Sequence, residues 1–129
     1  MLKRILIVDD SESVRDVMRM FLKDVATVEI CGEASDGLEA VQKSKRLKPD
    51  LVVLDLALPS MNGVEVASVL KRAMPKMPII VFTMYSERLG EALRSAIGVD
   101  AVLEKPNGMG QLIPSISKLL ATKTGQPDA

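Results

Sequence analysis

Histidine and tryptophan are absent from the sequence, which has one cysteine, two phenylalanines and one tyrosine among its 129 residues. Without histidine, the chain cannot form a Ser-His-Asp triad, bind zinc through imidazole or donate a phosphoryl group from phosphohistidine. The single Cys31 cannot form an internal disulfide, as is typical of proteins in a reducing compartment. Because Cys31 lies in a short apolar run, we interpret it as a small core residue.

Neither sign of charge is in excess, since 17 basic residues balance 17 acidic ones. A chain without net positive charge lacks the general field that holds nucleic acid, so we expect no direct nucleic-acid binding by this segment. Its longest apolar runs are only as long as strands, so we expect no membrane span. Lys3 and Arg4 lead directly into such a run without a signal-peptide pattern, and we therefore expect a cytoplasmic location.

The sequence does contain a regular alternation of strand-like and helix-like segments. Five short apolar runs are typical of strands: residues 4–8, 28–31, 51–54, 79–82 and 101–103. Each run is followed by apolar residues at helical spacing. This pattern predicts an α/β fold, with a doubly wound parallel sheet of five strands and five helices covering its two faces. We place one domain at residues 1–121 and expect residues 122–129 to form a polar tail or the start of a linker.

Polar residues predict where three of the helices begin. Ser13, followed by Asp16 three residues later, resembles a capping box for the first helix. Ser35 can cap the second helix. Asn62, followed by Glu65 at the same spacing, is expected to cap the third.

Apolar spacing and a proline constrain the second helix and the last one. Leu38, Val41 and Leu47 mark the inner side of the second helix. Pro114 constrains the last helix, because proline is tolerated only within about the first turn. We therefore expect that helix to begin at Gly110 or later.

Polar and charged residues follow the strands at the places where an open parallel sheet binds its ligands. In such sheets the ligand site lies beyond the carboxyl ends of the strands. The residues at those ends are Asp9, Asp10, Asp55, Thr83, Glu104 and Lys105.

Three of these residues are aspartates, and their charges need neutralising. Two carboxylates about 4 Å apart repel by roughly 4 kcal/mol at an effective dielectric constant near 20. An all-oxygen set without thiolate or imidazole favours a hard cation, and we expect Mg²⁺. With Lys105 and Thr83 opposite, the set suits phosphoryl transfer to Asp55, which would form an acyl phosphate.

Each feature also has an ordinary structural interpretation when it is taken alone. Asp9 and Asp10 could cap the first helix, Asp55 could be a turn residue, and Lys105 before Pro106 could be a solvated lysine. What favours the functional interpretation is that all of them fall at strand ends of one regular alternation.

Four segments together resemble the receiver domains of bacterial response regulators. They are residues 5–11 (ILIVDDS), 55–63 (DLALPSMNG), 81–83 (VFT) and 104–106 (EKP). The resemblance covers essentially the whole chain. It implies a flavodoxin-like fold with strand order 2-1-3-4-5. It also implies phosphorylation of Asp55 by a sensor histidine kinase or a phosphotransfer protein, in a reaction that requires Mg²⁺.

The resemblance further implies roles for individual residues. Asp10, Asp55 and the Ala57 carbonyl would bind the metal directly, and Asp9 would act mostly through water. Lys105 would contact the phosphoryl group across a cis peptide bond to Pro106. An output domain, a downstream protein or a second protomer would dock on the fourth helix, fifth strand and fifth helix.

Some positions depart from the family pattern. Val102 replaces the aromatic residue that usually acts as a switch, Met84 follows Thr83 where a small residue is usual, and Asn107 replaces an aromatic residue. We expect Met84 to shield the acyl phosphate from water. Val102 leaves open the alternative of a degenerate receiver that is a constitutive protein-interaction module.

Two enzyme classes fit the sequence poorly. Phosphatases with an aspartate nucleophile resemble one another in a second aspartate two residues later, where this chain has Ala57. A nucleotide-binding enzyme would have a glycine-rich loop after the first strand, and none is present. We therefore expect a phosphoacceptor that takes part in its own phosphoryl transfer and dephosphorylation, rather than an enzyme.

Overall fold

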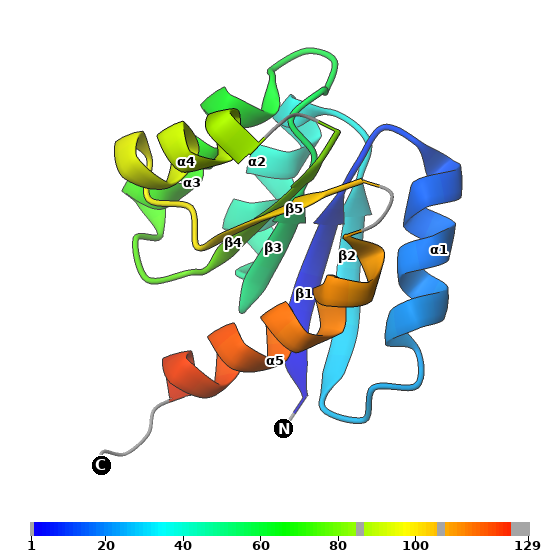
Figure 1. The fold of residues 1–129 in the computed structure, drawn as a ribbon. Coiled ribbons are helices and arrows are strands. Elements are labelled where there is room, and N and C mark those ends of the chain that lie inside the picture. The colour runs from blue at the N-terminus through cyan, green and yellow to red at the C-terminus, as the bar shows by residue number, and fades with distance from the viewer. Residues whose placement is uncertain (1, 85–86, 106–107, 125–129) are drawn as a thin grey trace.

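The computed structural model describes residues 2–84, 87–105 and 108–124 (Figure 1). Its strands are β1 (Lys3–Val8), β2 (Val28–Ala34), β3 (Leu51–Leu54), β4 (Ile79–Thr83) and β5 (Ala101–Glu104). Its helices are α1 (Glu12–Leu22), α2 (Gly37–Leu47), α3 (Gly63–Ala73), α4 (Glu87–Ala96) and α5 (Met109–Thr124). All strand pairs are parallel and the order is β2-β1-β3-β4-β5. The predicted fold class and strand order are confirmed.

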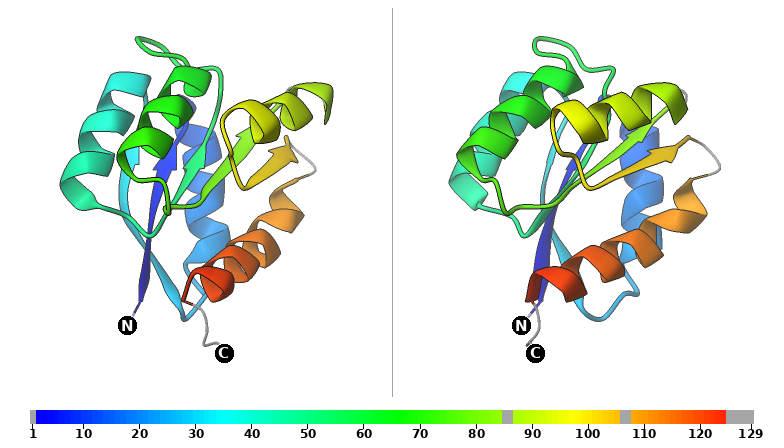
Figure 2. Two further views of the ribbon diagram at one scale, coloured as in Figure 1. Left: turned by 90° about the vertical axis from the view of Figure 1, so that its left-hand side faces the viewer. Right: turned by 60° about the vertical axis from the view of Figure 1, so that its left-hand side comes forward.

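Helices cover both faces of the sheet, with α1 and α5 on one face and α2, α3 and α4 on the other (Figure 2). Alternate residues of one strand enter opposite cores: Val52 and Leu54 pack toward α2, α3 and α4, whereas Leu51 and Val53 pack toward α1 and α5. All four of these side chains are fully buried. A central strand covered on both sides has no polar face, which is why β3 is wholly apolar in sequence.

The first two helices begin at residues other than those predicted. Ser11, and not Ser13, caps α1: its backbone is extended and its Oγ accepts the N–H of Val14 at 3.3 Å, while Ser13 already lies inside the helix. Asp36, and not Ser35, caps α2 by accepting the N–H of Glu39 at 2.8 Å. The prediction for α3 is confirmed, because Asn62 caps it by accepting the N–H of Glu65.

Strand β2 continues three residues beyond its predicted end. Its pairing with β1 shifts between Ile5 and Leu6, which pair with Ile30 and Gly32, so Cys31 is the extra residue of a bulge. Cys31 is half-buried and packs against the core, and its burial raises the pKa of the thiol. Leu38, expected on the inner side of α2, is instead 49% exposed.

Helix α5 begins at Met109, one residue before the earliest predicted start, and Pro114 lies in its second turn. Proline has no N–H to donate to the carbonyl of Gly110, yet the helix continues past it, and burial of Leu112, Ile116 and Leu120 against the sheet helps to offset the missing hydrogen bond. The helix continues to Thr124, three residues into the segment expected to be a tail. Within the described part of the chain, no helix is both long and apolar enough to cross a membrane.

Candidate functional site

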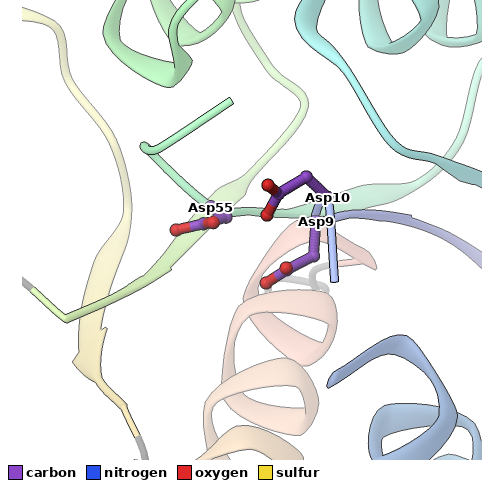
Figure 3. A group of neighbouring side chains, drawn as sticks. All are labelled: Asp9, Asp10 and Asp55. Atoms are coloured by element: carbon purple, nitrogen blue, oxygen red, sulfur yellow. The ribbon is translucent and has the colours of Figure 1, made fainter. Parts of the chain in front are cut away.

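Three carboxylates meet where β1 and β3 end. Asp9 and Asp10 follow β1 and Asp55 follows β3, and their side chains point into the same region (Figure 3). One oxygen from each lies within 4.8 Å of the others. The three line a cavity of about 510 Å³ together with Ala57, Thr83, Met84 and Lys105, among other residues. The fold therefore brings together all the site residues predicted from sequence.

Asp9 is fully buried, and each of its carboxylate oxygens has a partner. Oδ1 accepts the backbone N–H of Ser11 at 2.9 Å, and Oδ2 lies 2.6 Å from the Nζ of Lys105. Asp10, by contrast, is exposed. A buried carboxylate is tolerated when it is paired and hydrogen-bonded, which accounts for Asp9 without any bound ion.

Asp55 is 5% exposed, and its Oδ2 lies 3.5 Å from the Nζ of Lys105. Burial raises the pKa of the Asp55 carboxyl above its ordinary value. The ammonium of Lys105 lowers this pKa, Asp9 raises it, and backbone hydrogen bonds from Ala57 and Leu56 lower it, but burial prevails. Asp55 thus carries a charge that its surroundings only partly compensate.

Lys105 is the cation shared by two of the three carboxylates. Its backbone N–H donates to the carbonyl of Thr83 at 2.8 Å, which fixes the start of its side chain against β4. Its Nζ lies 5.7 Å from the centre of the Phe82 ring. One lysine facing three carboxylates leaves the cluster with a formal charge of −2, counted as one minus three.

Two further predicted residues lie at the wall of the same cavity. Thr83 is 1% exposed at the end of β4. Met84, the next residue, is 75% exposed and also lines the cavity.

Val102, at the position of the expected switch residue, is half-buried against the core beneath α3 and α4. Pro106, Asn107 and Tyr85 lie outside the described residues, and so does the predicted cis peptide bond.

The loop after Asp55 is tightly closed. The N–H of Gly63 donates to the carbonyl of Leu56 at 2.9 Å. A Cβ at position 63 would lie 2.4 Å from the Asp55 carbonyl oxygen and 2.4 Å from the Leu56 Cα. Only glycine therefore allows α3 to begin so close to the strand that carries Asp55.

The same loop is fastened to the start of α2. The N–H of Gly37 donates to the carbonyl of Pro59 at 3.0 Å. Ser60, which has a positive φ of 66°, accepts the N–H of Leu38 at 3.1 Å through its Oγ and donates to Asp36 Oδ1 at 3.2 Å. We call these contacts the loop latch.

Arg15 supports the site and was not predicted from sequence. Its Nη1 donates to the carbonyl of Asp9 at 2.6 Å, and its Nε pairs with Glu33 Oε1 at 2.9 Å. The guanidinium thereby connects the peptide between Asp9 and Asp10 to the end of β2. Its place one helical turn after Ser11 could have indicated this contact, but only once Ser11 was recognised as the cap.

Comparison with known proteins gives a consistent result. The family model described as "Response regulator receiver domain" matches residues 5–117. Chemotaxis protein CheY of Thermotoga maritima is 36% identical over 122 residues, which cover 91% of this chain and 97% of CheY. Response regulator protein VraR of Staphylococcus saprophyticus is 32% identical over 89% of this chain, but the match spans only 55% of VraR.

A solved structure of a complex is also similar. It is the complex of CheX and CheY with beryllofluoride and Mg²⁺ from Borrelia burgdorferi. The matched chain is 25% identical, with a TM-score of 0.81, over 92% of this chain and 90% of the other.

Proposed function

Because this chain belongs to the response regulator receiver domain family, we propose that it accepts a phosphoryl group on Asp55 in a Mg²⁺-dependent reaction and signals by changing conformation. The observation that carries the proposal is the cluster of three carboxylates that converge within 4.8 Å beside one lysine. Such a cluster costs stability unless a cation neutralises it, because like charges at that distance repel.

Asp55 is the carboxylate best placed to be the nucleophile. It lines the cavity and is only partly neutralised, whereas both oxygens of Asp9 are already engaged. In the proposed step, an Asp55 oxygen forms a bond to phosphorus as the bond between phosphorus and the donor's leaving atom breaks. The product is an acyl phosphate.

The residues of the cluster fit a hard divalent cation. All the donors are oxygens, and a cation with a charge of +2 would neutralise the formal charge of −2 on the cluster. Mg²⁺ would be held by Asp10, Asp55 and the Ala57 carbonyl, with Asp9 acting mostly through water because its oxygens already have partners. When bound, the metal supplies charge neutralisation for the phosphoryl oxygens.

Lys105 and Thr83 supply the protein's own contacts to the phosphoryl group. The Nζ of Lys105 lies 3.5 Å from Asp55, within reach of an oxygen on a group attached there. Thr83, at the end of β4, lines the same cavity and can offer its hydroxyl. Together they would stabilise the charge that spreads over the phosphoryl oxygens during transfer.

The proposed donor is a sensor histidine kinase or a phosphotransfer protein in the cytoplasm, since this chain has no histidine of its own. The output surface would comprise α4, β5 and α5, where an output domain, a downstream protein or a second protomer would dock. In this role the chain is a phosphoacceptor that takes part in its own phosphoryl transfer and dephosphorylation, and it acts on no other substrate.

Incubation with acetyl phosphate and Mg²⁺ tests the assignment of Asp55. We predict that intact-protein mass spectrometry will show the addition of one phosphoryl group, and that Asp55→Asn will abolish it. Asp24→Asn, at an exposed aspartate outside the site, is the matched control and should be labelled fully. Full labelling of the Asp55→Asn variant would refute the proposal.

A further inference from the structure

A second cavity lies at the end of the molecule away from Asp55. It lies between the C-terminal ends of α2 and α3, beside the segments that lead into β3 and β4. Figure 2 shows α2 and α3 side by side, with the β3–α3 loop at their opposite end. The cavity has a volume of about 580 Å³, within the range of sites that take a side chain or a small ligand. We call it the basal pocket.

The interior of the basal pocket is apolar and adaptable. Pro49 and Met77 are buried, Met74 is half-buried and Ala73 is exposed, and all four line the cavity. Methionine side chains have several rotatable bonds and are common at surfaces that accept varied apolar groups. The interior therefore suits one aliphatic or aromatic side chain from outside.

The polar part of the pocket is positively charged. Lys45 and Lys48 both line it, both are exposed, and neither forms an ion pair with any residue that the structure describes. Asp50 also lines it and keeps its negative charge, although its Oδ2 accepts the backbone N–H of Arg4 at 2.7 Å, so the lining has a formal charge of +1, two minus one. Lysine side chains without ion-pair partners among the described residues therefore lie beside an apolar cavity.

The surrounding segments have the same sign of charge. Residues 40–50 and 66–78 together contain seven basic residues and one acidic residue, and with the paired Glu39 and Asp100 the local net charge is +4, seven minus three. The whole chain has a net charge of +0. Two of the seven, Lys43 and Lys71, pair with Glu39 and Asp100, and the other five are exposed.

We propose that the basal pocket docks an acidic peptide segment of a partner protein. One apolar side chain of that segment enters the hollow, and flanking carboxylates pair with Lys45 and Lys48. The positive charge beside the pocket favours a negatively charged partner. The apolar interior favours a partner that also has an apolar side chain, which a purely polar anion lacks.

Two other anionic partners fit the pocket less well. Single-stranded nucleic acid is held largely by base stacking on aromatic side chains, and none lines the pocket. A membrane surface is bound by apolar side chains that project outward, whereas Met77 and Pro49 are recessed. The site also lies apart from Asp55, so the proposal does not depend on the proposed phosphorylation.

Methionine methyl signals provide a direct test. The protein has eight methionines, and labelling them with ¹³C at the methyl group allows Met74 and Met77 to be observed individually by NMR. The probe is a synthetic peptide with glutamate on one face and leucine at every third or fourth position. We expect saturable shifts of the Met74 and Met77 signals. Replacing leucine with serine, or glutamate with lysine, should weaken binding by at least about tenfold.

Two protein variants separate the two parts of the pocket. Lys45→Glu with Lys48→Glu should weaken binding by about tenfold or more, and Ala73→Trp should do the same by filling the hollow. The matched control, Lys3→Glu with Lys23→Glu, changes the net charge equally and lies outside the pocket. It should bind like the wild type. Circular dichroism establishes that each variant is folded.

Three results would overturn the proposal. One is the absence of saturable shifts at Met74 and Met77. Another is equal weakening by the control pair, which would indicate unspecific charge attraction. The third is tighter binding of a single-stranded oligonucleotide or of phosphatidylglycerol vesicles with the same dependence on Lys45 and Lys48, because the surface would then bind a polyanion rather than a peptide.

Discussion

At the residue scale, we expect Met84 to affect the lifetime of a phosphorylated Asp55. It is 75% exposed at the wall of the cavity that contains Asp55. Hydrolysis of an acyl phosphate requires water to approach in line with the bond that breaks. A long side chain beside that path reduces access.

We predict that Met84→Ala will speed dephosphorylation severalfold without changing the site of labelling. The measurement is the decay of the phosphorylated protein, followed by mass spectrometry after the phosphodonor is removed. Met20→Ala, at a 65% exposed residue of α1, is the control and should leave the decay rate unchanged. An unchanged or longer lifetime in Met84→Ala would count against shielding.

Asp10 and Lys105 should affect metal binding in opposite directions. Asp10→Ala removes a proposed direct oxygen ligand and should weaken Mg²⁺ binding by at least about tenfold. Lys105→Ala removes a positive charge that contacts Asp9 and Asp55, so Mg²⁺ should bind as tightly as in the wild type or more tightly. Isothermal titration calorimetry measures both. Equal affinity in Asp10→Ala and the wild type would refute the ligand assignment.

At the scale of single elements, α2 contains a polar atom without a partner. Ser44 is fully buried, and its Oγ makes no hydrogen bond with any residue that the structure describes. Serine is also a weaker helix former than alanine. A buried hydroxyl without a partner costs about 1–3 kcal/mol.

We predict that Ser44→Ala will stabilise the domain by about 1 kcal/mol or more. Urea unfolding measures the change. Ser117→Ala, at an exposed position inside α5, is the matched control and should contribute only the smaller difference in helix propensity, about 0.5 kcal/mol. A loss of stability in Ser44→Ala would mean that the hydroxyl has a partner, such as a buried water molecule.

The elements that the sequence predicted well are those whose signal is local. Strand β3 was predicted to the residue because a central strand with both faces covered needs four apolar residues in a row. The end of β2 was not predicted, because Gly32 and Glu33 resemble loop residues in sequence. They belong to the strand only because they pair with Leu6 and Ile7 of β1. Pairing between distant segments leaves no local pattern.

The predicted starts of α1 and α2 were wrong for a related reason. Ser11 and Ser13 are both good caps by residue type, and the choice between them depends on where β1 ends and the chain turns. That the predicted site residues would line one cavity followed from sequence because they lie at or just after strand ends, and a parallel sheet brings strand ends together. The contacts between these side chains could not be predicted, since the contact of Lys105 with Asp9 joins residues 96 positions apart.

At the scale of the whole molecule, we expect the signal to travel through α4, whose described side chains contribute little to the core. Among its residues from Glu91 to Ala96, only Leu93 is buried. Gly90 within this helix weakens it by about 1 kcal/mol relative to alanine. With Val102 in place of an aromatic switch, we expect phosphorylation to act by shifting this weakly held helix.

We predict that beryllofluoride with Mg²⁺ will change amide hydrogen exchange most across residues 87–97. Exchange is measured by mass spectrometry, and Asp55→Asn with the same additives is the control. Changes confined to residues 55–63 would contradict a route through α4. The absence of any change in the wild type, despite bound beryllofluoride, would favour a degenerate receiver.

The net charge of the chain did not predict how charge is distributed over the folded molecule. The balance of 17 basic and 17 acidic residues suggested a molecule without an electrostatic preference. The fold instead gathers acidic residues around Asp55 and exposed basic residues around the basal pocket. A sum over the sequence cannot show this separation, because it discards position.

The loop latch has a consequence for engineering chimeric receivers. A Cβ at position 37 would lie 1.8 Å from the carbonyl oxygen of Met61, so the loop and the start of α2 fit only as a pair. Ser60 adds hydrogen bonds to Asp36 and to the backbone of Leu38. A transplant of residues 56–62 into another receiver should therefore include residues 36–38, since two segments that are separate in sequence form one interchangeable part.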